Sequence, residues 1–237
     1  MRNIISIAGR EIHSYFVSPL AYVAIFFFVF VCGFIFALAI ATGYTQADMS
    51  PLLHSMVFVS LILAPVLTMG LLAQETSSGS IELLMTKPVR DAEVVLGKFF
   101  GALAVYCLIL VVTLEFPLMY EIWGNPDWGL IAAGYIGLLV CGIAFIGIGT
   151  LASSLTNSQI AAWLIGTAIL LFFWLVGFLG YSSTSWVTDI ASRVSIYENF
   201  GDFARGIVDG KNLLFFLSLA VVFLFMSVRA IENRRTV

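Results

Sequence analysis

The chain has 237 residues, of which 61% are hydrophobic and only 11% are charged, and its formal net charge is −3. Its mean hydropathy of +1.05 is too high for a folded chain with a water-compatible surface, which excludes a soluble globular enzyme and indicates an integral membrane protein. A transmembrane β-barrel is excluded too, because the apolar runs are continuous where barrel strands would alternate. The cysteines Cys32, Cys107 and Cys141 all fall inside these runs, so they form no disulfide framework.

Apolar runs long enough to cross a bilayer recur along the chain. A hydrocarbon core of about 30 Å needs about 20 apolar residues in a helix. The last run is short, but Lys211 and Arg229 flank it and can extend their charged ends towards water. The sequence therefore predicts an all-α integral membrane protein with a single transmembrane domain over 1–237, whose six spans lie at about 20–42, 52–73, 94–120, 129–152, 159–181 and 213–228.

Residues 1–18 precede the first span and have an amphipathic helical pattern. Apolar side chains recur at helical spacing at Ile5, Ala8, Ile12, Tyr15 and Phe16, with polar residues largely on the other side. This pattern predicts an N-terminal helix that lies in the membrane interface and ends at Ser18-Pro19, where the chain turns into the bilayer. The alternative is a simple flanking segment.

The distribution of lysine and arginine predicts the orientation, because cytoplasmic loops retain these residues and exported loops lose them. An even number of spans places both termini on one side of the membrane. That side carries Arg2, Arg10, Lys87, Arg90, Lys98, Arg229, Arg234 and Arg235, against Arg193, Arg205 and Lys211 on the other. Both termini and the segment between the second and third spans are therefore predicted to be cytoplasmic.

The segment at 74–93 is more regular than a simple loop. Ser77, Ser78 and Gly79 can cap a short helix through Ile81, Leu83, Leu84 and Met85, which Pro88 ends before the third span. A partly apolar helix on the cytoplasmic surface is suited to docking a partner. The alternative is that its apolar residues pack on the bilayer surface.

The outer segment at 182–211 contains more apolar residues than a soluble loop carries. They are Trp186, Val187, Ile190, Val194, Ile196, Phe200, Phe203 and Ile207. We expect outer re-entrant helices here, lying against or dipping into the outer leaflet before the last span.

The segment after the second span resembles the core motif of ABC-2 type ABC transporter permeases. The matching residues are Glu75, Gly79, Ser80, Glu82, Leu84, Thr86, Pro88, Val89, Glu93, Val95, Gly97 and Lys98. In that family the segment is the coupling helix that contacts the ATPase subunit. The resemblance therefore implies that Glu75, Gly79, Ser80, Ile81, Glu82, Leu83, Leu84, Met85, Thr86 and Pro88 couple the chain to an ATPase.

The resemblance extends over the whole chain, with an elbow helix, six spans and Phe203–Asp209, which is similar to a Phe-x-Arg-Gly-Ile/Val-x-Asp motif. The stretch from Arg10 to Tyr22 is most similar to gliding-motility and nitrous-oxide-reductase-maturation type permeases. Thr76 departs from many relatives, which have Arg there and could form a salt bridge. The resemblance implies a bacterial cytoplasmic (inner) membrane protein that assembles with ABC ATPase subunits and a second permease copy, identical or related.

Several chemistries are not expected of this chain. A phosphate-binding loop needs Gly-x-x-x-x-Gly-Lys-Ser/Thr, which Gly97-Lys98-Phe99 does not satisfy, so ATP and Mg²⁺ are expected on the partner ATPase and no cofactor on this chain. His13 and His54 fall at opposite membrane faces, which argues against a metal site. The sequence has no basic-aromatic patch for nucleic acid. We therefore expect a membrane subunit and not an enzyme.

Glu115 lies within the third predicted span, where a central charge costs about 2.5–3.5 kcal/mol on insertion scales. One interpretation is a role in translocation or gating. The alternatives are pairing with another helix, or solvation near the outer headgroups, since Tyr120 and Trp123 follow closely.

The predicted function is that of a permease subunit that couples ATP hydrolysis by a separate subunit to export or extraction of a substrate. A second hypothesis is mechanotransmission, in which the complex passes conformational change to a membrane-anchored periplasmic auxiliary protein at 182–211 without moving a solute. A third, an intramembrane enzyme using Glu115 or His54, is weakest because no second catalytic group is placed beside either residue. The sequence leaves open the substrate and the choice between homodimer and heterodimer.

Overall fold

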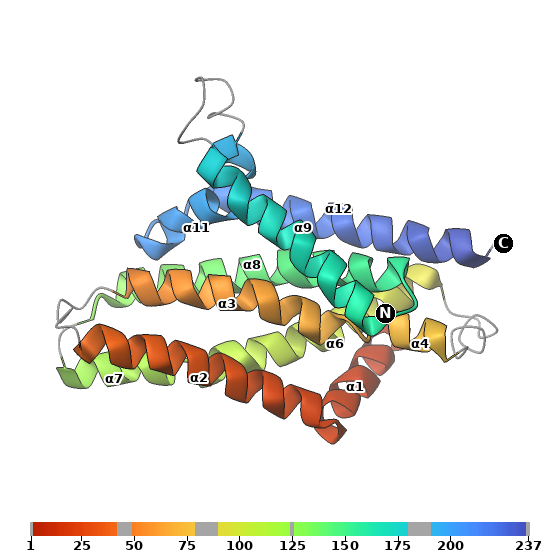
Figure 1. Ribbon diagram of the computed structural model, residues 1–237, viewed down its shortest axis with the longest axis horizontal. Coiled ribbons are helices and arrows are strands. Elements are labelled where there is room, and N and C mark those ends of the chain that lie inside the picture. The colour runs from red at the N-terminus through yellow and green to blue at the C-terminus, as the bar shows by residue number, and fades with distance from the viewer. Residues whose placement is uncertain (1, 42–48, 79–89, 124–125, 180–190, 236–237) are drawn as a thin grey trace.

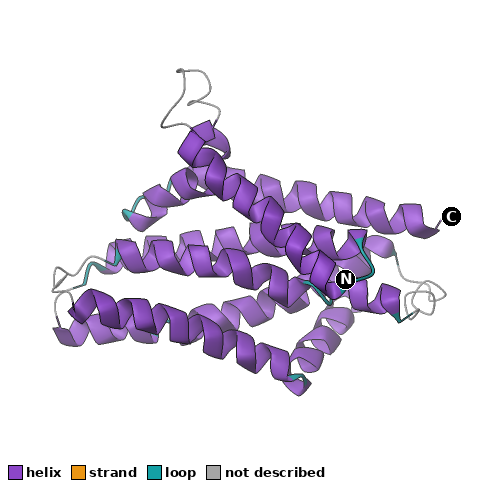
Figure 2. Ribbon diagram, viewed as in Figure 1, coloured by secondary structure: helices purple, strands orange, loops and turns teal. Residues whose placement is uncertain are grey.

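The computed structural model describes residues 2–41, 49–78, 90–123, 126–179 and 191–235. Within these ranges the chain is almost entirely helical and has no strand (Figure 2). Six helical segments are long and apolar enough to cross a membrane, which confirms the predicted fold class. They are Pro19–Ala41, Ser50–Ser77, Asp91–Ile122, Trp128–Leu155, Gln159–Phe178 and Gly210–Asn233.

The spans form a bundle around α8, whose residues are buried along most of its length (Figure 1). The helices α3, α6, α9 and α12 all pack against α8, whereas α2 packs mainly against α3. The bounds of these helices and of the short α7 are α2 Pro19–Ala41, α3 Ser50–Thr68, α6 Asp91–Val112, α7 Glu115–Trp123, α8 Trp128–Leu155, α9 Gln159–Leu179 and α12 Gly210–Arg235.

Tyr106 joins three of the spans in the core of the bundle. Lipid provides no hydrophobic drive between helices, so close packing and hydrogen bonds hold them together. The fully buried hydroxyl of Tyr106 in α6 donates to the carbonyl of Leu138 in α8 at 3.2 Å and shares a 3.0 Å hydrogen bond with Ser60 of α3. The ring occupies the space that a side chain at Gly142 of α8 would fill.

The predicted span 94–120 is divided into two helices, α6 and α7, by a turn that begins at Thr113. Pro117 explains the break, because it has no N–H to donate to the Thr113 carbonyl four residues before it. That carbonyl accepts a hydrogen bond from the Tyr135 hydroxyl of α8 at 2.8 Å. Glu115 is therefore the first residue of α7 and does not lie in the middle of a continuous helix.

Both ends of the described chain, Arg2 and Arg235, lie at the same end of the bundle, as the even number of spans predicts (Figure 1). We call this the terminal end and the opposite one the distal end. At the terminal end α1 (Arg2–Val17) meets α2 at a sharp bend at Ser18 (Figure 1). The Ser18 hydroxyl oxygen accepts a hydrogen bond from the N–H of Leu20 at 3.2 Å, which helps start α2. The placement of α1 in a membrane interface stays a prediction.

At the distal end α11 (Ile196–Ala204) packs against α8 and α9. Phe203 lies against Gly137 of α8, where an added Cβ would come within 2.6 Å of the Phe203 Cβ. Gly206 has a φ of +85°, a left-handed conformation that suits glycine at a helix end. The Phe203–Asp209 motif thus forms a helix end and the turn that leads to α12. Entry of this segment into the membrane stays a prediction.

Candidate functional site

Two glycines one helical turn apart allow α1 to lie against the beginning of α6. Gly97 and Gly101 have the four-residue spacing of small residues at close helix contacts. A Cβ added at Gly97 would lie 2.7 Å from the Ile7 Cβ, and one added at Gly101 would lie 2.6 Å from the Glu11 Cβ. A side chain at either glycine would therefore push α1 away from α6.

Lys98 follows the first of these glycines and is only 1% exposed. Its Nζ atom donates to Oε1 of Glu11 in α1 and to Oε1 of Glu75 in α4 (Ala73–Ser77), both at 2.9 Å. The guanidinium of Arg10 lies 3.8 Å from each of these two oxygens, on the more exposed side. We call Arg10, Glu11, Glu75 and Lys98 the ion cluster.

The ion cluster is formally neutral, with two carboxylates and two cations. A buried ammonium without partners loses several kcal/mol of hydration, and excellent hydrogen-bond geometry is needed to compensate. Glu11 and Glu75 are 14% and 21% exposed, so the cluster lies at the margin of the apolar core. Removal of Lys98 would leave the Glu11 and Glu75 carboxylates without their buried counter-charge, so the positions of the three helices depend on one another.

The turn between α3 and α4 is held by Ser153 of α8. Its hydroxyl oxygen accepts from the N–H of Leu72 at 3.0 Å and of Ala73 at 3.1 Å. The same hydroxyl donates to the carbonyl of Met69 at 3.0 Å. The buried Ser153 side chain therefore forms hydrogen bonds with backbone groups at the end of α3 and the start of α4 that have no partner within their own helix. As a result α4, which carries Glu75, begins at a fixed position.

Two further contacts attach the ends of α1. The Tyr15 hydroxyl donates to the carbonyl of Leu67 in α3. Burial, reinforced by the Glu11 carboxylate, raises the pKa of Tyr15, so its hydroxyl remains a protonated donor. Near the start of α1, the Asn3 amide donates to the Glu93 carboxylate of α6 at 3.1 Å. With the ion cluster between them, these contacts hold α1 along its whole length.

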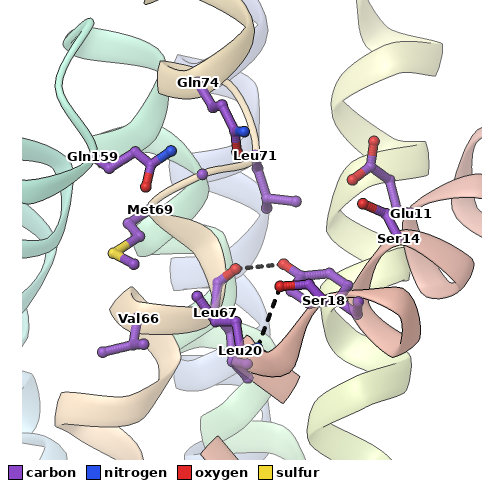
Figure 3. A pocket seen from close by; sticks show the side chains of 12 residues that line it. Glu11, Ser14, Ser18, Leu20, Val66, Leu67, Met69, Leu71, Gln74 and Gln159 are labelled. Atoms are coloured by element: carbon purple, nitrogen blue, oxygen red, sulfur yellow. Dashed lines mark hydrogen bonds between the residues drawn. The ribbon is translucent and has the colours of Figure 1, made fainter. Parts of the chain in front are cut away.

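A polar cavity of about 110 Å³ lies beside the ion cluster, between α1, the end of α3 and the start of α9. Figure 3 shows Glu11 and Ser14 of α1 on one side of it and Met69, Gln74 and Gln159 on the other. The cavity is therefore lined by a carboxylate, hydroxyls and amides, and it touches a member of the ion cluster directly.

The structure brings one of the predicted coupling residues, Glu75, into contact with Lys98, which also binds Glu11. The other predicted coupling residues, Gly79, Ser80, Ile81, Glu82, Leu83, Leu84, Met85, Thr86 and Pro88, lie outside the described residues. Glu115 is partly exposed in α7 at the distal end and makes no ion pair with any described residue.

Sequence reasoning missed the pairing of Glu11 with Lys98 and the role of Ser153. The two residues of the pair are 87 positions apart, so spacing alone cannot pair them. The signal that was present is the Gly97–Gly101 repeat, which marks α6 as a surface for close approach by another helix. Ser153 gives no comparable signal, because a serine late in an apolar span is common.

The arrangement favours a mechanical connection over acid–base chemistry. The charged groups of the cluster bind one another, and they join α1, α4 and α6 into one unit. Among the described residues there is no group of three or more His, Cys, Asp or Glu side chains that could hold a metal ion.

The apolar helices and their packing define a multi-pass membrane protein. Over residues 18–234 the sequence matches the family described as ABC-2 family transporter protein. The chain therefore belongs to the ABC-2 family of transporter proteins. No curated protein matches the sequence. Family membership makes the chain a membrane subunit of the ABC transporter class and implies an ABC ATPase as its partner.

Proposed function

We propose that the chain is the permease subunit of an ABC-2 type transporter and couples ATP hydrolysis by a separate subunit to export or extraction of a substrate. The observation that carries this proposal is the ion cluster. Glu75 stands at the start of the segment expected to contact the ATPase, and it binds Lys98 of the third span at 2.9 Å. ATP and Mg²⁺ belong to the partner ATPase.

In this proposal the ion cluster transmits movement from the ATPase to the spans. A displacement of the segment at 74–93 moves α4, and α4 cannot move alone because Glu75 shares Lys98 with Glu11. The movement therefore reaches α1 and α6 together. The working assembly contains a second permease copy and ATPase subunits on the terminal side, which we place in the cytoplasm of a bacterium with the chain in its inner membrane.

Copurification tests this proposal. The tagged chain is purified from native membranes in mild detergent, copurified proteins are identified, and ATP hydrolysis is measured. We expect a P-loop ATPase that is lost on Glu82→Arg, a charge reversal in the segment expected to bind it. Glu121→Arg, an exposed change in α7 at the distal end, is the matched control and should retain the ATPase. Retention of a fully active ATPase by Glu82→Arg would contradict the docking site.

A gating role for Glu115 forms part of the proposal. Its carboxylate lies at the N-terminus of α7, where the helix dipole stabilises negative charge. Glu115→Gln should alter coupled transport or the stimulation of ATP hydrolysis. Wild-type values for both would assign Glu115 a structural role only.

Mechanotransmission remains a second candidate, and the packing of α11 supports it. His54 of α3 and Trp174 of α9 both contact the ring of Tyr197 in α11, with ring centroids 5.4 Å apart in each pair. Movement of the spans would therefore reach the distal surface through α11. A stable periplasmic partner bound there, without any transported ligand, would favour this function over transport.

A further inference from the structure

Two polar atoms of α9 have no hydrogen-bond partner among the described residues. They are Nε1 of Trp163 and Oγ1 of Thr167, and both atoms are buried. Lipid offers no hydrogen bond, so an unpaired polar group inside a membrane bundle is costly, and buried polar groups normally bind protein or ordered water. Two such groups one helical turn apart therefore point to a common partner between the helices.

Thr167 differs in this respect from other threonines of the spans. A hydroxyl inside a helix commonly donates to a backbone carbonyl three or four residues before it. Thr68 and Thr150 each donate to the carbonyl four residues before them, at 3.0 and 2.7 Å. The Thr167 hydroxyl forms no such bond with its own helix. It is therefore directed to a partner outside α9.

The helix that faces Thr167 is interrupted by a proline. Pro65 lies inside α3 and has no N–H to donate to the Leu61 carbonyl. A Cβ added at Gly166 would lie 3.3 Å from the Pro65 Cβ, so α9 crosses α3 at this proline. The missing bond would run along α3 from Pro65 to Leu61, which places that carbonyl on the side of α3 that meets α9. In membrane spans such carbonyls are bound by neighbouring side chains or by ordered water.

A line of polar side chains leads from the polar cavity to this crossing. Gln159, Trp163 and Thr167 are four residues apart, so they are neighbours on one face of α9. Side chains of a helix lean towards its N-terminus, which directs Thr167 towards Trp163 and Trp163 towards Gln159. Gln159 itself lines the polar cavity (Figure 3). Thr167 lies about 12 Å further along the helix axis, at about 1.5 Å per residue.

Water is the partner that fits these groups. A water molecule occupies about 30 Å³ in the liquid, so the polar cavity of about 110 Å³ holds a few of them. Water both donates and accepts, and a buried water makes about three hydrogen bonds. It can accept from the Trp163 N–H, bind the Thr167 hydroxyl and donate to the Leu61 carbonyl. A lipid or a second copy of the chain cannot reach atoms that the chain itself buries.

We propose that water enters the bundle between α3 and α9, from the polar cavity as far as Thr167, and is bound there by Trp163, Thr167 and the Leu61 carbonyl. We call this path the α9 water track. It contrasts with the contact between α6 and α8, where Tyr106 donates directly to the Leu138 carbonyl at 3.2 Å. The α9 water track is carried by the packing of α3 and α9 and does not rest on the proposed function.

Reaction of a buried thiol with silver ions tests the α9 water track. Thr167→Cys and Ala168→Cys are made in a background without Cys32, Cys107 and Cys141, and the proteins are placed in nanodiscs with silver nitrate. The thiol that remains is alkylated after unfolding and measured by mass spectrometry. A silver ion is similar in size to water and reacts with a hydrated thiol, so Thr167→Cys should react at least about tenfold faster than Ala168→Cys. Ala168 is exposed on the other side of α9 at the same depth. Equal rates, or no reaction of Thr167→Cys, would overturn the proposal.

A second pair of variants tests where the water enters. Gln159→Phe fills the polar cavity and should slow the silver reaction of Thr167→Cys. Ile160→Phe is the matched control, because Ile160 is 70% exposed beside Gln159 and its enlargement leaves the cavity open. An equal rate in the two variants would overturn entry through the polar cavity.

A stability measurement needs no cysteine. Thr167→Val replaces the hydroxyl with a methyl group of similar size. A hydroxyl bound to water is lost at the cost of one hydrogen bond, which should lower the midpoint of thermal unfolding by about 2–4 °C. Removal of an unpaired hydroxyl would raise the midpoint instead. An unchanged or raised midpoint would overturn the α9 water track, whereas the copurification of an ATPase would be unaffected by either result.

Discussion

Lys98 in the third span and Glu75 at the start of the segment expected to contact the ATPase are joined by a hydrogen bond of 2.9 Å, although 23 positions separate them. The same Nζ atom binds Glu11 of α1 at 2.9 Å. A helix of the terminal end, a membrane span and the beginning of the segment expected to contact the ATPase therefore share one buried cation. This arrangement leads to predictions that test the packing and the coupling separately.

Replacement of Lys98 should destabilise the fold. Lys98→Met leaves Glu11 and Glu75 without their buried counter-charge, and loss of one partner of a buried pair costs about 3–5 kcal/mol. Equilibrium unfolding in mixed micelles measures the change. Lys211→Met, at an exposed lysine, is the control and should change stability by less than about 0.5 kcal/mol. Equal stability of the two variants would show that the cluster contributes nothing to packing.

Side chains at the glycines of α6 should separate α1 from the bundle. Gly101→Val places carbon atoms where the Glu11 side chain lies, and such overpacking costs about 1–3 kcal/mol. Gly9→Ala is the matched control, because an added Cβ there meets nothing within 4 Å. That change should stabilise α1 by about 0.5–1 kcal/mol. Protease accessibility of α1 and thermal unfolding report both effects, and an unchanged Gly101→Val protein would contradict the close approach.

Ser153→Ala should loosen the turn between α3 and α4. It removes the acceptor for two backbone N–H groups and the donor to Met69, and unsatisfied buried groups cost about 1–3 kcal/mol. The neighbouring Ser154 is also buried, but among the described residues its hydroxyl binds only the Leu151 carbonyl of its own helix. Ser154→Ala should therefore have a smaller effect. Hydrogen exchange of the Leu72 and Ala73 amides should accelerate in Ser153→Ala alone, and equal exchange in the two variants would refute this role.

A double-mutant cycle tests the cause of the break between α6 and α7. Tyr135→Phe removes the hydrogen bond to the Thr113 carbonyl and should cost about 1 kcal/mol. Pro117→Ala supplies an N–H that can bind the same carbonyl, so Tyr135→Phe should cost less in that background. Unfolding of the four proteins gives the coupling energy. Additive effects would show that the proline and the tyrosine act independently.

The sequence predicted the helical fold class and the number of spans because about 20 consecutive apolar residues have few structures open to them in a bilayer. It did not predict the break at Thr113, where the carbonyl that Pro117 cannot bind accepts hydrogen bonds from the Phe116 N–H and from the Tyr135 hydroxyl of a different helix. Only part of the ion cluster could be predicted from the sequence. Glu75 and Lys98 stood in one motif, but their partner Glu11 comes from a helix whose packing depends on Gly97 and Gly101.

The most direct test of the central claim follows the movement of α1 in response to ATP. Spin labels at Ile5 of α1 and Ile160 of α9, both exposed, report their separation in a background without Cys32, Cys107 and Cys141. We expect a distance change when ATP is added to the complex with its ATPase. Glu75→Gln should abolish this change while the ATPase remains bound. An unchanged ATP-driven response in Glu75→Gln would show that coupling does not pass through the ion cluster.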